Sequence, residues 1–103
     1  MNTKKFIDQL EQTFKECLEI AKAKNADYAN NDDAFKNFKA VELVGVDARR
    51  GVMVRMVDKM SRISNLLDRE GKVADEKIED TVKDLINYSN ILLQLIIDLD
   101  TKK

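Results

Sequence analysis

The sequence predicts an all-α fold, a helical bundle of three long helices plus one short helix. Proline is absent and the 103 residues include only three glycines, so little interrupts a long helix. Apolar residues recur at spacings of three and four along three stretches, which is the period of an amphipathic helix. At this length one hydrophobic core is expected, and we predict a single domain over residues 1–103.

The first half of the chain is predicted to hold one long and one short helix. The long helix is expected over Thr3–Lys24, because the apolar residues there form one stripe. That stripe comprises Phe6, Leu10, Phe14, Cys17, Leu18 and Ala21. The short helix is expected over Ala40–Val44, since Gly45 favours the left-handed conformation that ends many helices.

The second half is predicted to hold two long helices, each with an apolar seam. Asp47 is a suitable N-cap for a helix that continues to about Glu70, before Gly71 ends it. The inward-facing residues predicted for this helix are Met53, Met56, Met60, Ile63 and Leu67. Asp75 is a suitable N-cap for the last helix, which we expect to reach about Leu99. Its predicted inward-facing residues are Ile78, Val82, Leu85, Leu92, Ile96 and Leu99.

The end of the last helix is more apolar than one seam requires. Residues 91–97 contain a single polar member, Gln94. A subunit of this size does not easily bury a helix on every side. We therefore predict that the C-terminal helix contacts another subunit and forms a homo-oligomer, either a dimer or a larger assembly. The alternative is that the chain's own bundle encloses this helix.

Composition excludes several kinds of function and location. The formal net charge is −1, which disfavours non-specific binding of duplex nucleic acid. Histidine is absent, which removes imidazole bases, Ser-His-Asp catalysis and histidine zinc sites. Cys17 is the only cysteine, so no internal disulfide is expected and a cytoplasmic location is predicted. No stretch is apolar enough for a membrane span, so we expect no membrane partner.

Residues 24–38 form the segment most like a recognition surface, with three of the six aromatic residues among amides and carboxylates. Aromatic rings can stack on a nucleobase, while amides and carboxylates can hydrogen-bond its edge. The candidate ligand-binding residues here are Lys24, Asn25, Asp27, Tyr28 and Asn37. For Phe35 and Phe38 we favour a role in anchoring the segment to the bundle over stacking on a ligand.

The helix after Asp47 has a polar face beside its methionine seam. This face comprises Arg55, Asp58, Lys59 and Arg62, at spacings of three and four. Two guanidinium groups and an ammonium group can hold phosphate, and a guanidinium can do so through two parallel hydrogen bonds. The alternative is a surface ion pair between Asp58 and Arg62, which stabilises a helix only slightly.

The last helix contains a row of acids and amides that extends into Asp84, Asn87 and Tyr88, the candidate ligand-binding residues of this helix. Asp80 and Asp84 lie one turn apart, so their carboxylates can share Mg²⁺, which prefers oxygen ligands. The alternative is that acids near the start of the helix interact with its dipole and with solvent. The metal role for Asp80 and Asp84 is expected only if the protein is an enzyme.

Four sequence motifs occur together over roughly residues 20–97. They are Lys24-Asn25-x-Asp27-Tyr28, Phe35-x-Asn37-Phe38, Val54-Arg55-Met56-x-Asp58-Lys59-x-x-Arg62-Ile63 and Glu79-Asp80-Thr81-x-x-Asp84-Leu85-x-Asn87-Tyr88. In this combination the chain resembles the small phage and prophage proteins of the nucleotide modification associated domain family. The resemblance implies an α-helical, virus-encoded protein linked to nucleotides.

A looser likeness is to the all-α nucleoside triphosphate pyrophosphatases of the MazG type. Those enzymes hold Mg²⁺ with four acids from two neighbouring helices. Here Asp58 is the only candidate on the first of those helices, and Lys59 and Arg62 stand where further acids are needed. This departure disfavours an enzymatic function, because metal-assisted attack on phosphate needs enough carboxylates to position the ion.

Three functions remain open on the sequence alone. The first, which we favour, is a phage protein that binds a nucleotide-like molecule without a cofactor and sequesters a host immune signal. The second is a Mg²⁺-dependent nucleotide pyrophosphatase, or an accessory enzyme of nucleotide modification, with Asp58, Asp80 and Asp84 at the metal. The third is a helical module that binds another protein through residues 91–97.

Overall fold

The computed structural model describes residues 1–28, 33–69 and 77–102, and these residues form helices and connecting turns without any strand. In chain order the helices are α1 (Thr3–Tyr28), the 3₁₀ helix η1 (Phe38–Val44), α2 (Ala48–Asp68) and α3 (Ile78–Thr101). The predicted all-α fold of three long helices and one short helix is confirmed for the described part of the chain. None of these helices is both long and apolar enough to cross a membrane.

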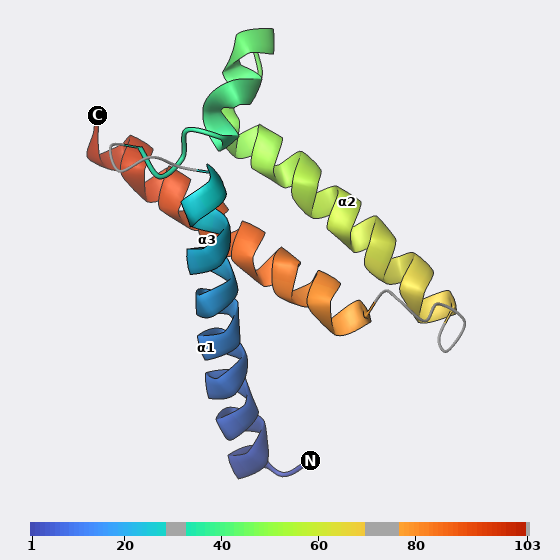
Figure 1. Ribbon diagram of the computed structural model, residues 1–103. Coiled ribbons are helices and arrows are strands. Elements are labelled where there is room, and N and C mark those ends of the chain that lie inside the picture. The colour runs from blue at the N-terminus through green and yellow to red at the C-terminus, as the bar shows by residue number, and fades with distance from the viewer. Residues whose placement is uncertain (29–32, 70–76, 103) are drawn as a thin grey trace.

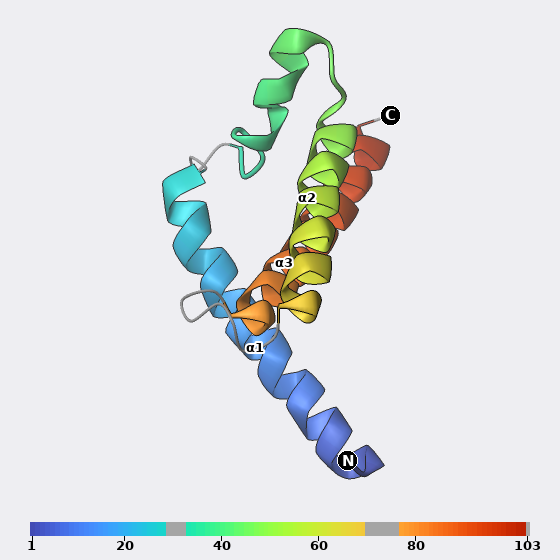
Figure 2. The ribbon, with the colours of Figure 1, turned by 90° about the vertical axis from the view of Figure 1, so that its right-hand side faces the viewer.

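Helices α2 and α3 lie side by side and antiparallel, and they form the central hairpin of the molecule (Figure 1). Helix α1 crosses α3 on one side of this hairpin, and its N-terminal half extends past α3 into solvent (Figure 1). Figure 2 shows α1 and η1 on the same side of the hairpin, whereas the opposite side bears no other described helix. The fold therefore has a covered face and an open face.

The first half of the chain differs from prediction at two helix ends. Helix α1 continues to Tyr28, beyond the predicted end at Lys24, because adding a residue to an existing helix costs little and neither glycine nor proline intervenes. The short helix begins at Phe38 rather than Ala40. Its predicted end is confirmed: Gly45 adopts the left-handed conformation with φ 77°, and its N–H donates to the carbonyl oxygen of Glu42 at 3.0 Å.

The predicted cap of α2 is confirmed, and the predicted start of α3 is wrong. The Asp47 carboxylate accepts a hydrogen bond from the Arg49 backbone N–H at 2.8 Å. Helix α2 ends at Asp68, and the predicted breaker and cap at Gly71 and Asp75 lie outside the described residues. Lys77 occupies the N-cap of α3 without a side-chain capping bond. Acids in the first turn, Glu79 and Asp80, stabilise that helix start through the helix dipole.

The hydrophobic core lies where η1, α2 and α3 meet. Its buried members are Phe38, Ala48, Val52 and Leu95, and Cys17 is buried separately on α1. Part of each predicted seam is wrong, because these predicted inward residues are exposed: Met53, Met60, Leu67, Val82 and Ile96. Both helices are apolar on two faces, and the period alone does not identify which face meets the neighbouring helix.

Gly51 permits the close contact between η1 and α2. A Cβ atom added at Gly51 would lie 2.8 Å from Cγ2 of Val41, whose branched side chain is stiff. Although alanine favours a helix over glycine by about 1 kcal/mol, we expect Gly51→Ala to destabilise the fold by about 1 to 3 kcal/mol through overpacking. The urea unfolding midpoint measures this, and adding Val41→Ala should restore stability. An unchanged or raised midpoint in the single variant would contradict this packing.

Candidate functional site

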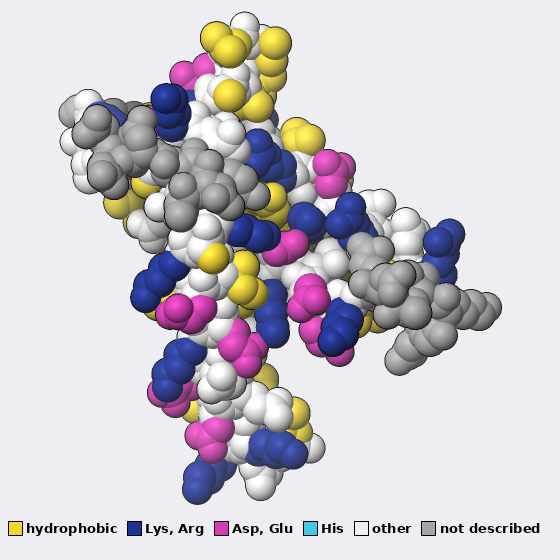
Figure 3. Space-filling model, viewed as in Figure 1, with side chains coloured by type: hydrophobic (Ala, Val, Ile, Leu, Met, Phe, Trp, Pro, Cys, Tyr) yellow, Lys and Arg dark blue, Asp and Glu magenta, His cyan; other side chains and the backbone are white. Residues whose placement is uncertain are grey.

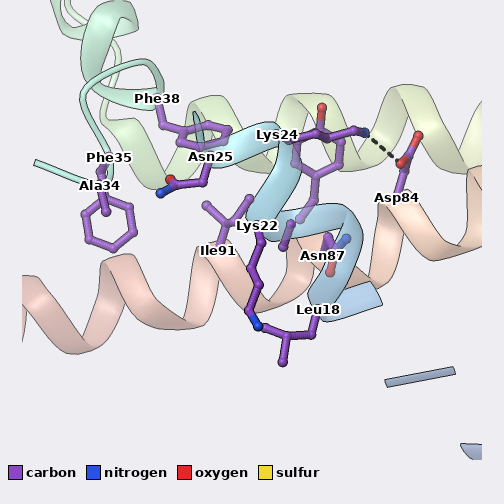
Figure 4. A pocket seen from close by; sticks show the side chains of 12 residues that line it. Leu18, Lys22, Lys24, Asn25, Ala34, Phe35, Phe38, Asp84, Asn87 and Ile91 are labelled. Atoms are coloured by element: carbon purple, nitrogen blue, oxygen red, sulfur yellow. Dashed lines mark hydrogen bonds and ion pairs between the residues drawn. The ribbon is translucent and has the colours of Figure 1, made fainter. Parts of the chain in front are cut away.

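A cavity of about 300 Å³ lies between the C-terminal part of α1, the middle of α3 and the segment that leads into η1. Phe35 and Phe38 lie at one end of the cavity and Asp84 at the other, with Lys24 extended toward Asp84 (Figure 4). The lining residues are Leu18, Ala21, Lys22, Lys24, Asn25, Ala34, Phe35, Phe38, Asp84, Asn87, Tyr88 and Ile91. We call this space the aromatic cavity.

The aromatic rings of the cavity are held by the core. Phe38 is only 7% exposed and belongs to the buried cluster, and Phe35 packs against that cluster. The Arg55 guanidinium lies 4.9 Å from the centroid of the Phe38 ring, a cation–π contact. The predicted anchoring role of Phe38 is confirmed by its burial. The same ring also forms a wall of the cavity, so anchoring and ligand contact are compatible.

Asp84 joins all three long helices at the polar end of the cavity. Its two carboxylate oxygens accept hydrogen bonds from Lys24 Nζ of α1 at 3.0 Å and Lys59 Nζ of α2 at 3.2 Å. Burial raises the pKa of Asp84, but the combined bonds from Lys24 and Lys59 outweigh it and hold the pKa below its ordinary value. The carboxylate is therefore ionised at neutral pH, with an ammonium group on each side.

Asn87 fixes α1 against α3. Its side-chain Nδ2 donates to the backbone carbonyl oxygen of Cys17 at 3.1 Å. Nearby, Lys83 Nζ pairs with a Glu16 carboxylate oxygen at 2.8 Å and ties the same two helices. Asn87 also lines the aromatic cavity, and its amide oxygen is the atom available to a ligand there.

A second cavity, of about 310 Å³, adjoins the first and is lined by Arg55, Asp58, Lys59, Arg62 and Tyr88. Three of these five side chains are cationic and one is acidic, so we call it the basic cavity. Figure 3 shows basic and acidic side chains gathered between α1 and α2 on the covered face of the hairpin. Tyr88 is the residue common to both cavities, and Lys59 connects them by pairing with Asp84.

The structure brings most of the candidate residues together. Those that line one of the two cavities are Lys24, Asn25, Arg55, Asp58, Lys59, Arg62, Asp84, Asn87 and Tyr88. Asp27 and Tyr28 belong to the last turn of α1, and their side chains lie outside the described part of the structure. Asn37 is exposed at the N-cap of η1, and Asp80 is exposed on α3; neither lines the aromatic cavity or the basic cavity.

Besides Phe35 and Phe38, which were predicted as anchors, five lining residues were not candidates from the sequence, namely Leu18, Ala21, Lys22, Ala34 and Ile91. Ala34 lies on the segment before η1, and the other four lie on helices. The helical spacing of Leu18, Ala21, Lys22 and Asn25 places them on one face of α1. Ile91 follows Asn87 by four residues, so the acid-amide row continues into an apolar position. Extending the candidate rows on α1 and α3 by one helical turn would have identified the lining residues that lie on those two helices.

The carboxylates do not form the cluster that a magnesium site needs. Among residues 1–28, 33–69 and 77–102, no group of three or more acidic or cysteine side chains is placed to hold a metal ion. A Mg²⁺ ion bound at Asp84 would have to displace the ammonium groups of Lys24 and Lys59. This arrangement does not fit the predicted metal role of Asp80 and Asp84, and we derive no reaction step from it.

The bonds to Asp84 predict a pH-dependent stability. Because its folded pKa is lowered, the contribution of Asp84 should be complete above about pH 4, the usual unfolded pKa, and should disappear as the pH falls through the folded value. Asp84→Asn should therefore cost about 1.5 to 3 kcal/mol near pH 7 and progressively less toward pH 2. Urea unfolding of both proteins over this range measures the difference.

Asp80→Asn, an exposed acid one turn earlier on the same helix, is the matched control. Its loss of stability near pH 7 should be smaller than that of Asp84→Asn, because Asp80 is an exposed acid at the helix start whereas Asp84 pairs with two lysines. A constant gap between Asp84→Asn and the wild type down to pH 2 would contradict the assigned ion pairs.

By its fold and cavities, the protein is a small all-α protein in which the aromatic cavity lies beside the basic cavity. The sequence model of the family described as nucleotide modification associated domain 1 matches residues 24–96. The match extends from the end of α1 almost to the end of α3, and the chain therefore belongs to this family. Searches of curated proteins and of solved structures gave no significant match.

Proposed function

We propose that the protein binds a nucleotide-like ligand across its two cavities, with the base and ribose in the aromatic cavity and phosphate in the basic cavity. The observation that carries this proposal is that the two cavities share Tyr88 as a lining residue and are therefore neighbours. Small-molecule sites span about 300 to 1,000 Å³. Each cavity is at the lower end of that range, which suits one moiety of a nucleotide in each.

The aromatic cavity has the groups that a nucleobase requires. Phe35 and Tyr88 offer ring faces for stacking, which contributes about 1 to 3 kcal/mol per base. Asn25 and Asn87 offer amide groups to the base edge and the ribose hydroxyls. Ile91 and Leu18 complete the wall with apolar contact.

The basic cavity has the charge that a phosphate requires. Arg55, Lys59 and Arg62 supply three cationic groups on one helix, and Asp58 is the acidic residue of the same lining. Guanidinium groups bind phosphate oxygens in pairs, and such charge-assisted bonds are about twice as strong as neutral ones. A phosphate entering beside Lys59 would compete with Asp84 for the same ammonium group, so ligand binding and the ion pairs at Asp84 should be coupled.

We further propose that the ligand is sequestered without chemical change. Asp84 pairs with two lysines, so a metal ion bound there would have to compete with both ammonium groups. In this proposal the protein is a sponge for a nucleotide immune signal, acting in the host cytoplasm during phage infection. Oligomerisation through the C-terminal helix is part of the same proposal, supported by the exposed side chains of Leu93 and Ile97.

Recovery of the ligand distinguishes sequestration from turnover. The protein is incubated with nucleoside mono-, di- and triphosphates and cyclic nucleotides, with and without Mg²⁺, then washed and denatured. We expect the released molecule to be chemically identical to the one supplied. Release of pyrophosphate or of a monophosphate that stops on Asp84→Ala would replace this proposal with the enzymatic alternative.

A further inference from the structure

The open face of the α2–α3 hairpin bears two apolar rows. On α2 the row comprises Met53, Val57, Met60 and Leu67, and on α3 it comprises Val82, Ile86, Leu93 and Ile96. The spacings alternate between three and four once Ser64 and Ser89 are included, which is the pattern of a helix–helix seam. Val57 is 62% exposed and Leu93 is 52% exposed, so the chain alone leaves these rows in water except at Ile86, which is half-buried.

Both rows point to the same side of the hairpin. Each α-helical residue is rotated by about 100° from the one before it. The buried residues Val52 of α2 and Leu95 of α3 mark the side of each helix that faces the core. Met53 and Ile96 each follow one of these residues directly. Each row is therefore rotated by about 100° from the buried side of its helix, in the same direction along the chain. Because α2 and α3 are antiparallel (Figure 1), equal rotations in the same sense place both rows on one face.

Helix α1 covers the other side. Asn87, whose side chain donates to the carbonyl oxygen of Cys17 on α1, precedes Leu95 by eight residues. It is therefore rotated by about 80° from Leu95, in the direction opposite to the apolar row. The apolar rows therefore lie opposite α1 and opposite both cavities. A nucleotide-binding face and an apolar face occupy the two sides of one hairpin.

The chain exposes more surface than a monomer of its mass should. Its accessible surface is 8017 Å², whereas a folded monomer of 11.8 kDa exposes about 5,900 Å². Its radius of gyration is 15.8 Å, against about 13 Å for a compact domain of this length. The excess is roughly 2,000 Å², and the protruding N-terminal half of α1 contributes to it. A standard protein interface needs only about 800 Å² from each partner.

We propose that a second copy of this chain covers the open face, so that α2 and α3 of the two copies form one four-helix core. The rows contain only apolar residues and two small serines, and Ser89 already donates to the carbonyl oxygen of Leu85 at 2.8 Å. Two identical faces can therefore meet without burying a charge or an unpaired polar group. The interface includes α2 as well as the C-terminal helix, and it leaves both cavities open.

Light scattering after size-exclusion chromatography tests this proposal without any ligand. We expect the wild-type protein at about 100 μM to have twice the mass of one 11.8 kDa chain. A mass equal to a single chain would overturn the proposal. The exposed control Asn65→Glu, on α2 but outside the row, should leave the mass unchanged.

Two charged double variants test the face itself. Val57→Glu with Leu93→Glu, and Val57→Lys with Leu93→Lys, place like charges across the seam, and each alone should lose the doubled mass. Mixing the two variants places opposite charges across the same seam and should restore it, even if either variant alone unfolds. A doubled mass in either variant alone, or a mixture that stays at the mass of one chain, would contradict this interface.

Discussion

Replacing Leu95 with alanine is expected to lower the free energy of unfolding by about 2 to 5 kcal/mol. Leu95 is only 1% exposed and belongs to the cluster formed with Phe38, Ala48 and Val52. The cluster is small, so the loss of one large side chain removes a substantial part of its packing. A native stability of about 5 to 15 kcal/mol makes a loss of this size a large fraction of the total.

Urea unfolding followed by circular dichroism measures this loss. Leu43→Ala is the matched control, because Leu43 is 91% exposed on η1 and the substitution has the same chemistry. We expect the control to change stability by less than about 0.5 kcal/mol. Equal effects of the two substitutions would mean that the core does not lie at the junction of η1, α2 and α3.

Replacing Arg62 with alanine is expected to weaken nucleotide binding by roughly 10-fold to 150-fold. This range corresponds to the loss of a charge-assisted hydrogen bond of about 1.5 to 3 kcal/mol, with each 1.4 kcal/mol equal to a factor of ten. Arg62 lines the basic cavity together with Arg55 and Lys59. Isothermal titration with the nucleotide that most raises the melting temperature measures the change in Kd.

Arg50→Ala is the control for Arg62→Ala. Arg50 is an exposed arginine near the start of the same helix and lines neither cavity, so its loss removes the same charge elsewhere. Melting temperatures without ligand identify any loss that comes from stability alone. If Arg50→Ala weakens binding as much as Arg62→Ala, the protein attracts phosphate through its overall charge and not through the basic cavity.

The helix ends that could be predicted are those with a local chemical cause. Asp47 has a carboxylate that accepts from the first turn of α2, and Gly45 permits the left-handed conformation that ends η1. The C-terminal end of α1 has no such cause in its own sequence. Asn25 and Asp27 favour turns, but the helix continues through both to Tyr28 because neither glycine nor proline interrupts it, so the predicted boundary fell short by one helical turn.

The inward faces were harder to predict, because α2 and α3 are apolar on two sides. On α2, the exposed row through Met53 and Met60 and the buried side that contains Val52 both fit a helical period, so the period does not tell them apart. The choice between them depends on Gly51 and Ala48, whose small size lets η1 approach α2. Such a contact involves distant parts of the chain and has no periodic signature.

The sequence could predict which residues belong to the candidate site, but not how they are arranged in space. Helical spacing placed Arg55, Lys59 and Arg62 on one face, and the structure gathers them at one cavity. The bond between Lys24 and Asp84 joins residues 60 positions apart, which no local spacing specifies. Nor did the sequence reveal that Tyr88 borders both cavities, the feature on which the proposed nucleotide site rests.

The most direct test of the proposed function is a thermal-shift screen of nucleotides and cyclic nucleotides, with and without Mg²⁺. A ligand at 100 times its Kd stabilises the fold by about 2.7 kcal/mol, which corresponds to roughly ten degrees or more in Tm for a domain of this size. We expect at least one nucleotide to produce such a rise without Mg²⁺, and Arg62→Ala to reduce it. No rise in Tm with any nucleotide at millimolar concentration would contradict nucleotide binding by this protein.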